Sequence, residues 1–93
     1  MKTVWKYDLK PAKKQEIAMP EGAVILTVQV QRGKPCLWAE VDTAAKPVGR
    51  VFEIFGTGQE MPTDMGVERR YAGTYQIDEG KALVFHVYER VNR

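Results

Sequence analysis

Residues 23–42, AVILTVQVQRGKPCLWAEVD, decide the fold, because two alternating runs are joined by a turn. In the first run, apolar residues at positions 24, 26, 28 and 30 alternate with polar residues at positions 27, 29 and 31. Successive side chains of a strand point to opposite faces, so this run predicts a strand with one buried face and one solvent-exposed face. The segment 32–35 is typical of a hairpin turn in which Gly33 takes a positive φ. Residues 36–42 return with Leu37, Ala39 and Val41 on one face, and we expect them to pair antiparallel with 24–31.

The same period of two recurs along the rest of the chain. Eleven Val and four Ile stand against four Leu, and branching at Cβ favours strands over helices. Helix is expected only as one turn, near residues 12–17 or within 61–68. We predict further strands at 3–9, 15–19, 50–55, 70–77 and 82–89, with 50–55 in a central place and 70–77 paired to 82–89 through a turn at 78–81. The sequence therefore predicts a single all-β domain over residues 1–93, a mainly antiparallel sandwich or small barrel of about five to seven strands with little helix.

Length, charge and cysteine content limit the class of protein. A chain of 93 residues should fold with a surface of about 5,500 Å², enough for one core but not for a large enclosed cavity. A formal charge of +2 is too small to indicate a nucleic-acid partner by itself. Cys36 is the single cysteine, which excludes an intrachain disulfide and a thiolate zinc site within one chain. No apolar run has the length of a signal peptide or a membrane helix, so we expect a cytoplasmic protein with no membrane partner.

Catalytic and metal-binding motifs are not evident. Cys36 and His86 could resemble a Cys–His nucleophile pair, but nothing in their spacing brings them together. The simpler interpretation is a small buried Cys36 and a histidine on a half-exposed strand face. The lone histidine, the lone cysteine and the scattered carboxylates lack any metal-ligand spacing. We therefore expect a protein that is not an enzyme, with no catalytic residue, no metal and no cofactor.

Residues 56–69 form the longest irregular stretch, and such loops are often functional. Its glycines allow close backbone approach, its two methionines adapt to irregular apolar surfaces, and the arginines at its end suit phosphate or carboxylate groups. The alternative is a tight bend at 56–58 in a surface loop whose charges serve solubility. The stretch predicts a site for an anionic small molecule or a partner protein, formed by Gly56, Thr57, Gly58, Arg69, Arg70 and, if strands 50–55 and 70–77 meet, Arg50.

Two aromatic residues, Trp38 and Tyr88, fall opposite the more obvious core faces of their strands. They could complete a second core layer, or they could form an exposed apolar patch at an interface. Aromatic side chains on strands beside basic loops are also typical of β modules that bind nucleic acid. Acidic residues separate the basic clusters here, so a nucleic-acid partner is the alternative rather than the expectation.

Five blocks of the chain carry a resemblance: WKYDL at 5–9, MPEGAVILTVQVQRGKPCLWAEVD at 19–42, RVFEIFGTGQ at 50–59, YAGTYQ at 71–76 and LVFHVYE at 83–89. Together they resemble a family of small proteins of unknown function found mainly in phage and prophage genomes and in some bacteria. The family brings no established activity and therefore no catalytic or binding residue.

The resemblance implies a context for the protein. By this resemblance we expect an accessory factor of the host cytoplasm rather than an enzyme, for example an anti-defence factor that sequesters a nucleotide-like host signal or blocks a host defence protein. A minor structural phage protein is the other context. From the residues themselves we expect a homo-oligomer, since seven strands leave an edge that a second copy could cover.

Overall fold

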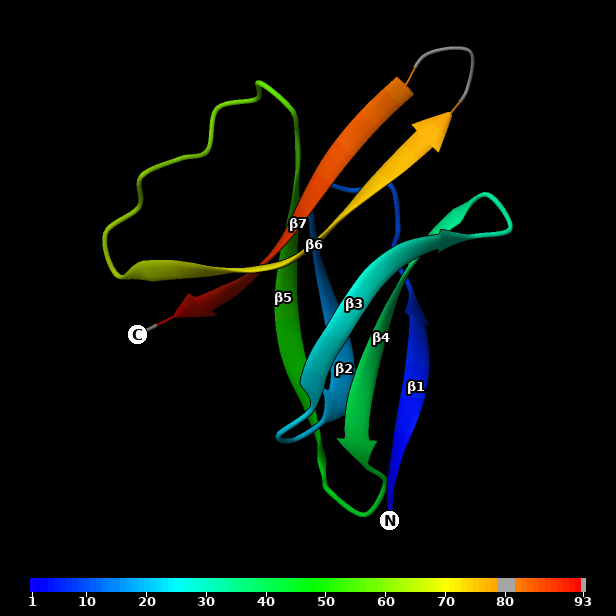
Figure 1. Cartoon of the computed structure of the whole chain (residues 1–93). Coiled ribbons are helices and arrows are strands. Elements are labelled where there is room, and N and C mark those ends of the chain that lie inside the picture. Colours follow the sequence, from blue (N-terminus) through cyan, green and yellow to red (C-terminus); the bar gives the residue numbers. More distant parts are fainter. Residues whose placement is uncertain (79–81, 93) are drawn as a thin grey trace.

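The chain folds into two antiparallel sheets that pack face to face (Figure 1). The computed structural model describes residues 1–78 and 82–92, and these residues contain strands but no helix, which confirms the all-β sandwich. The expected helical turns are wrong, because residues 14–17 extend as a strand and residues 61–64 have no regular structure. In the described residues the strands are β1 (Lys2–Asp8), β2 (Lys14–Pro20), β3 (Val24–Gln31), β4 (Lys34–Asp42), β5 (Pro47–Gly56), β6 (Val67–Asp78) and β7 (Ala82–Asn92).

The strand order confirms the pairings expected from the sequence. The three-stranded sheet has the order β1-β4-β3, and the four-stranded sheet has the order β2-β5-β7-β6. Both expected hairpins, β3–β4 and β6–β7, pair antiparallel, and β5 lies between β2 and β7 as its apolar faces indicated. The turn expected at 78–81 lies, apart from its first residue, outside the described residues.

The β3–β4 turn has the backbone that its glycine predicted. Gln31 pairs with Lys34, so Arg32 and Gly33 alone form the loop, with φ angles of 52° and 77°. Positive φ at both central residues is the geometry of the two-residue hairpin whose twist matches the flanking strands.

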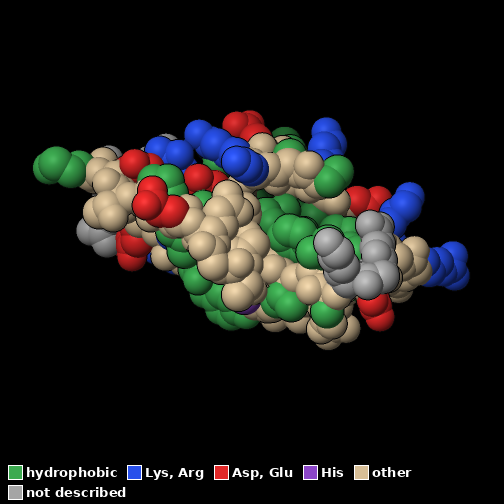
Figure 2. Space-filling view, turned by 90° about the horizontal axis from the view of Figure 1, so that it is seen from above, with side chains coloured by type: hydrophobic (Ala, Val, Ile, Leu, Met, Phe, Trp, Pro, Cys, Tyr) green, Lys and Arg blue, Asp and Glu red, His purple; other side chains and the backbone are tan. Residues whose placement is uncertain are grey.

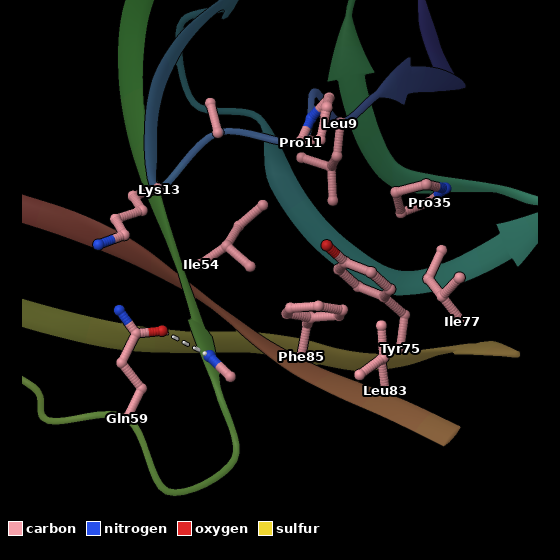
Figure 3. A pocket seen from close by; sticks show the side chains of 12 residues that line it. Leu9, Pro11, Lys13, Pro35, Ile54, Gln59, Tyr75, Ile77, Leu83 and Phe85 are labelled. Atoms are coloured by element: carbon pink, nitrogen blue, oxygen red, sulfur yellow. Dashed lines mark hydrogen bonds between the residues drawn. The ribbon is translucent and has the colours of Figure 1, made fainter. Parts of the chain in front are cut away.

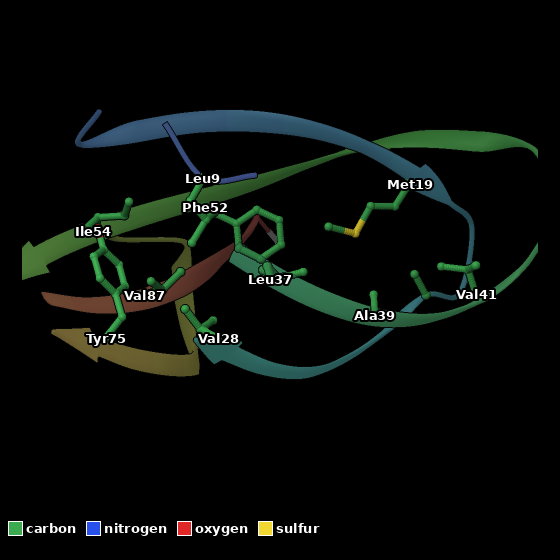
Figure 4. Close-up of a cluster of buried hydrophobic side chains, with 11 residues drawn as sticks. Leu9, Met19, Val28, Leu37, Ala39, Val41, Phe52, Ile54, Tyr75 and Val87 are labelled. Atoms are coloured by element: carbon green, nitrogen blue, oxygen red, sulfur yellow. The ribbon is translucent and has the colours of Figure 1, made fainter. Parts of the chain in front are cut away.

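The core lies between the inner faces of the two sheets (Figure 4). The three-stranded sheet contributes Leu37, Ala39 and Val41, which are at most 1% exposed and confirm the inward face expected for residues 36–42. The four-stranded sheet contributes fully buried side chains from three of its strands, namely Met19, Phe52 and Val87. The alternation of the sequence thus produces one apolar layer between the sheets.

The alternation expected for residues 24–31 is wrong, because β3 contains a bulge. Ile25 pairs with Ala39 and Thr27 pairs with the next residue of β4, so Leu26 is an extra residue in the ladder. A bulge shifts the phase of a strand by one residue. Val28 therefore faces the core at 4% exposure, whereas Val24 and Leu26 are 55% and 50% exposed.

The sandwich is closed along one side, where β3 packs against β6 (Figure 1). At this contact Gly73 follows a second bulge, and a Cβ atom added to it would lie 2.7 Å from the Cβ of Val28. Only a residue without a side chain fits there. The Cα trace measures 42 × 37 × 16 Å, and this flat shape explains why the surface of 6340 Å² exceeds the area expected for a protein of this length.

Candidate binding cleft

An open cleft of about 390 Å³ lies at one end of the sandwich. Viewed from that end, apolar side chains gather in a hollow of the surface (Figure 2). The β6–β7 hairpin forms one wall, and the segments at the end of β1 and the start of β4 form the opposite wall (Figure 3). The apolar lining consists of Leu9, Pro11, Ala12, Pro35, Ile54, Tyr75, Ile77, Leu83 and Phe85.

The cleft arises from a mismatch in strand length. β6 and β7 have 12 and 11 residues, whereas β1, β3 and β4 have 7, 8 and 9. The inner face of the hairpin therefore continues past the end of the opposite sheet. Its cross-strand pairs there are Tyr75 with Phe85, whose stacked rings have centroids 5.4 Å apart, and Ile77 with Leu83. Leu83 remains 42% exposed, because none of the described strands of the opposite sheet extends over it.

Two nitrogen-bearing side chains line the cleft beside β5 (Figure 3). The backbone N–H of Gly56 donates a hydrogen bond of 3.0 Å to Oε1 of Gln59, which fixes the orientation of the amide. Nε2 of Gln59 donates to no other described residue, so its two donors are available. The ammonium group of Lys13 makes no ion pair with any other described residue. In Figure 3 the nitrogen atoms of both side chains lie on the far side of Ile54 from Tyr75 and Phe85, so it is the rim of the cleft at this end that is suited to a carboxylate or phosphate.

A phenol also reaches this apolar space. Tyr75 is 7% exposed, and burial raises the pKa of its hydroxyl above the usual value of 10.0, so it stays neutral at physiological pH. A cleft with apolar walls and a few polar groups is the usual architecture of a small-molecule site. The arrangement can hold a molecule with a flat apolar part and an anionic group.

The expected glycine loop contributes only partly to this cleft. Gly56 lines it, whereas Thr57 and Gly58 form the tight turn that follows, closed by a hydrogen bond of 3.0 Å from Gln59 N to Gly56 O. Gly58 has a φ of 86°, which a residue with a side chain rarely adopts. The irregular stretch ends at residue 66 rather than 69, because β6 already begins at Val67.

Arg50 and Arg70 come together in a second, smaller pocket of about 270 Å³. Their strands are not neighbours, since β7 lies between β5 and β6. Arg50 donates to both carboxylate oxygens of Glu89 at 2.6 and 2.8 Å and to the carbonyl oxygen of Ala23. Arg70 is exposed and makes no ion pair within the described part of the chain. Of the two arginines, Arg70 alone therefore has a guanidinium available to a ligand.

Arg69 faces the opposite side of the same strand and binds groups of its own chain. Its guanidinium donates to Oε1 of Glu53 at 2.8 Å, to the carbonyl oxygen of Pro62 at 2.8 Å and to Asp64 at 3.1 Å. It also lies 5.8 Å from the ring centroid of Phe55. These contacts fasten the 57–66 loop to the outer face of the four-stranded sheet. Arg69 and Arg70 thus do not share a site.

Tyr88 and Trp38 lie on the outer faces of different sheets. Tyr88 packs edge-on between Phe55 and Tyr71, with ring centroids 6.1 and 5.6 Å away. Trp38 is half-buried on the three-stranded sheet, where it lines a shallow depression with Val4 and other residues. Neither residue lines the cleft or the arginine pocket.

Comparison with known proteins identifies a family but no activity. The family described as "Domain of unknown function (DUF7352)" matches residues 1–93. The chain belongs to the DUF7352 family. Neither the search of curated proteins nor the search of solved structures found a match. Membership confirms the expected resemblance to a family of unknown function. The described part of this DUF7352 chain has no helix of the length and apolarity needed to cross a membrane.

In the DUF7352 chain, the histidine and the cysteine considered as a catalytic pair lie on different sheets, His86 on β7 and Cys36 on β4. The His86 ring lies between two hydroxyl groups, with Nε2 2.8 Å from Thr57 and Nδ1 3.1 Å from Thr74. Cys36 lies on the other sheet, where burial and a hydrogen bond to Asp8 raise the pKa of its thiol. A catalytic cysteine needs the opposite shift. The described residues also contain no group of three side chains arranged to bind a metal ion.

Proposed function

We propose that this DUF7352 protein is a non-enzymatic accessory binding protein of phage type that sequesters a small host molecule in the host cytoplasm. The ligand carries a flat apolar part and an anionic group, as nucleotide-like signals do. The observation that carries the proposal is the apolar cleft of about 390 Å³ with an amide and an ammonium group at one end. Its size falls within the range of about 300–1,000 Å³ that is usual for small-molecule sites.

Two features of the cleft support binding of a ring with an anionic substituent. The half-buried ring of Phe85, stacked on the buried Tyr75, presents aromatic surface against which a flat ring packs favourably. Lys13 supplies a positive charge, and Gln59 supplies N–H donors in a fixed orientation. Among the described lining residues there is no nucleophile paired with a base, and this favours binding over catalysis.

The proposal is tested with retained ligand and with a defined probe. Protein purified from phage-infected cells is examined by native mass spectrometry, which should show a bound small molecule that is released on denaturation. Adenosine 5′-monophosphate is titrated by calorimetry, with adenosine as the matched probe without the phosphate. We expect the monophosphate to bind more tightly, and Lys13→Ala should remove the difference.

Matched variants locate the binding. Leu83→Asp places a charge in the apolar cleft, and Val24→Asp makes the same kind of change at a residue that is 55% exposed and does not line the cleft. We expect Leu83→Asp to weaken binding about tenfold or more, which corresponds to about 1.4 kcal/mol, and Val24→Asp to leave it unchanged. No retained molecule together with no saturable binding of the monophosphate would overturn the proposal.

The proposal also includes self-association. β1 and β3 end the three-stranded sheet, and β2 and β6 end the four-stranded sheet. Unpaired backbone groups at an exposed strand edge favour pairing with another chain. A second copy of this chain is the partner proposed for one of these edges.

A further inference from the structure

β1 has the most regular free edge of this fold. Among the described edge strands, β3 and β6 are interrupted by bulges and pack against each other. β2 pairs with β5 without a shift in register, but it ends at Pro20, which has no N–H. β1 pairs with β4 without any shift in register from Lys2 to Asp8. Natural proteins usually interrupt or cover such an edge, or place charged side chains along it. β1 has no interruption but carries Lys2, Lys6 and Asp8, so a partner strand on this edge has to match their charges.

The backbone hydrogen bonds show which groups of β1 face the free edge. Thr43 N donates to Met1 O at 2.9 Å, and Leu9 N donates to Pro35 O at 3.0 Å. In an antiparallel ladder every second residue exchanges both of its hydrogen bonds with the neighbouring strand. The odd-numbered residues of β1 thus bond to β4. The even-numbered residues, from Lys2 to Asp8, direct their N–H and C=O groups outward.

Side-chain charge then selects one register for a second β1 strand. Two antiparallel copies related by a two-fold axis must pair even-numbered residues with even-numbered residues. Two of the possible axes would bring lysines together. With the axis at Val4, Lys2 of each copy lies opposite Lys6 of the other, and with the axis at Lys6, the two Lys6 side chains lie opposite each other. Like charges directly opposite are destabilising. If the axis lay nearer to either end of β1, fewer than half of the residues of the strand would have a partner in the second copy.

An axis at Trp5 avoids these conflicts. It pairs the whole strand and sets Lys2 opposite the second copy's Asp8 at both ends. It also sets Val4, which is 51% exposed, beside the aliphatic part of the second copy's Lys6. These charged groups also have partners within the chain: Lys2 lies 3.9 Å from Glu40, Lys6 donates to Oε1 of Gln31 at 2.9 Å, and Cys36 donates to Asp8 at 3.5 Å. An ammonium group has three donors and a carboxylate has several acceptor positions, so each exposed group can also bond across the axis.

We propose that two copies of this chain pair through β1 about a two-fold axis at Trp5, which joins their three-stranded sheets into one continuous sheet. Trp5 faces the same side of the sheet as the core-facing residues of β4 yet is 42% exposed, and on the axis it packs against the second copy's Trp5. This inference rests on the proposed self-association and does not depend on ligand binding in the cleft.

Charge reversal tests the register. Sedimentation equilibrium of the full chain should show a dimer. Lys2→Asp alone places carboxylates opposite each other, and Asp8→Lys alone places ammonium groups opposite each other. Each change should raise the dimer dissociation constant about tenfold. A mixture of the two variants restores opposite charges at both ends, so it should form a heterodimer with about the affinity of the wild type.

A backbone variant tests the edge itself. The N–H of Val4 faces the free edge, so Val4→Pro removes hydrogen bonds between copies and leaves the β1–β4 ladder intact. We expect a folded monomer by circular dichroism and sedimentation. Lys14→Asp on the β2 edge is the control and should leave the dimer unchanged. A wild-type protein that stays monomeric at several hundred micromolar, or a dimer whose constant none of the β1 variants alters, would overturn the inference.

The two proposals can fail separately. The cleft is not formed by residues 2–8, so the Val4→Pro variant should bind adenosine 5′-monophosphate as the wild type does. Loss of the dimer with retained binding supports both proposals. A dimer without any ligand binding refutes the function of the cleft and leaves the β1 interface standing.

Discussion

The contact between Gly73 and Val28 predicts a large effect for the smallest possible side chain. In Gly73→Ala, the new Cβ would lie 2.7 Å from Cβ, 2.9 Å from Cγ2 and 3.1 Å from the backbone nitrogen of Val28. Val28 is 4% exposed and β3 is paired to β4, so neither its side chain nor its backbone has room to move. The clash must therefore separate β3 from β6.

The expected cost follows from two opposing effects. Overpacking of a core typically costs about 1–3 kcal/mol, and replacing glycine by alanine returns about 0.4–1 kcal/mol by restricting the unfolded chain. We expect Gly73→Ala to lower the free energy of unfolding by about 1–2 kcal/mol. For a domain of this size this corresponds to a fall in Tm of roughly 5–15 °C.

Urea unfolding and thermal melts followed by circular dichroism measure this change. Gly49→Ala is the matched control, because the three heavy atoms nearest to its added Cβ all belong to the side chain of Glu16, which is exposed and can move aside. Its stability should stay within about 0.5 kcal/mol of the wild type. If the two variants proved equally stable, the close packing of β3 on β6 would not be a constraint on the fold.

Three further predictions concern single side chains. Arg69→Ala should speed proteolytic cleavage within residues 57–66, because it removes the contacts to Pro62 and Asp64. Arg70→Ala should leave the cleavage rate unchanged, and equal rates for the two variants would contradict the role of Arg69 in holding this loop. Burial favours the neutral phenol of Tyr75, so its contribution to stability is complete below pH 10 and falls as the pH rises toward its raised pKa. Tyr75→Phe should make alkaline unfolding less steep, and an unchanged profile would refute this. The raised pKa of the buried Cys36 thiol predicts that it reacts with Ellman's reagent only on unfolding, and rapid labelling of the native protein would show otherwise.

Local pattern was sufficient to predict the strands and the Arg32–Gly33 turn. The alternation of apolar and polar side chains that marks a strand can be read from neighbouring residues, and the turn can be read from a glycine, which accepts a positive φ. The prediction that Leu26 faces inward was wrong. It assumed that side chains alternate without interruption along residues 24–31, whereas the bulge inserts one residue and reverses the faces of the residues before it. Nothing within residues 24–31 marks the bulge, which is set by how β3 meets β4 and β6.

The cleft could not be predicted from local pattern, because it depends on where strands distant in sequence end. Tyr75 and Phe85 have the alternation of core residues, and only the short opposite sheet leaves them facing an open space. The sequence did contain a pattern that places Arg69 and Arg70 on opposite faces. Once β6 is extended back to Val67, adjacent residues must face opposite sides of the sheet.

The pairing of β1 with β4 and of β2 with β5 also determines the order in which the chain can fold. Neither of the first two strands has its neighbour until residues 34–56 have been synthesised, and each pairing closes a long loop at an entropic cost. The β3–β4 and β6–β7 hairpins need only nearby residues and can form in microseconds. Topologies dominated by distant pairings fold in milliseconds to seconds. During synthesis the segment Lys2–Pro20 therefore emerges before either of its partner strands, and we expect the docking of β1 and β2 onto the later strands to be the slow step of folding.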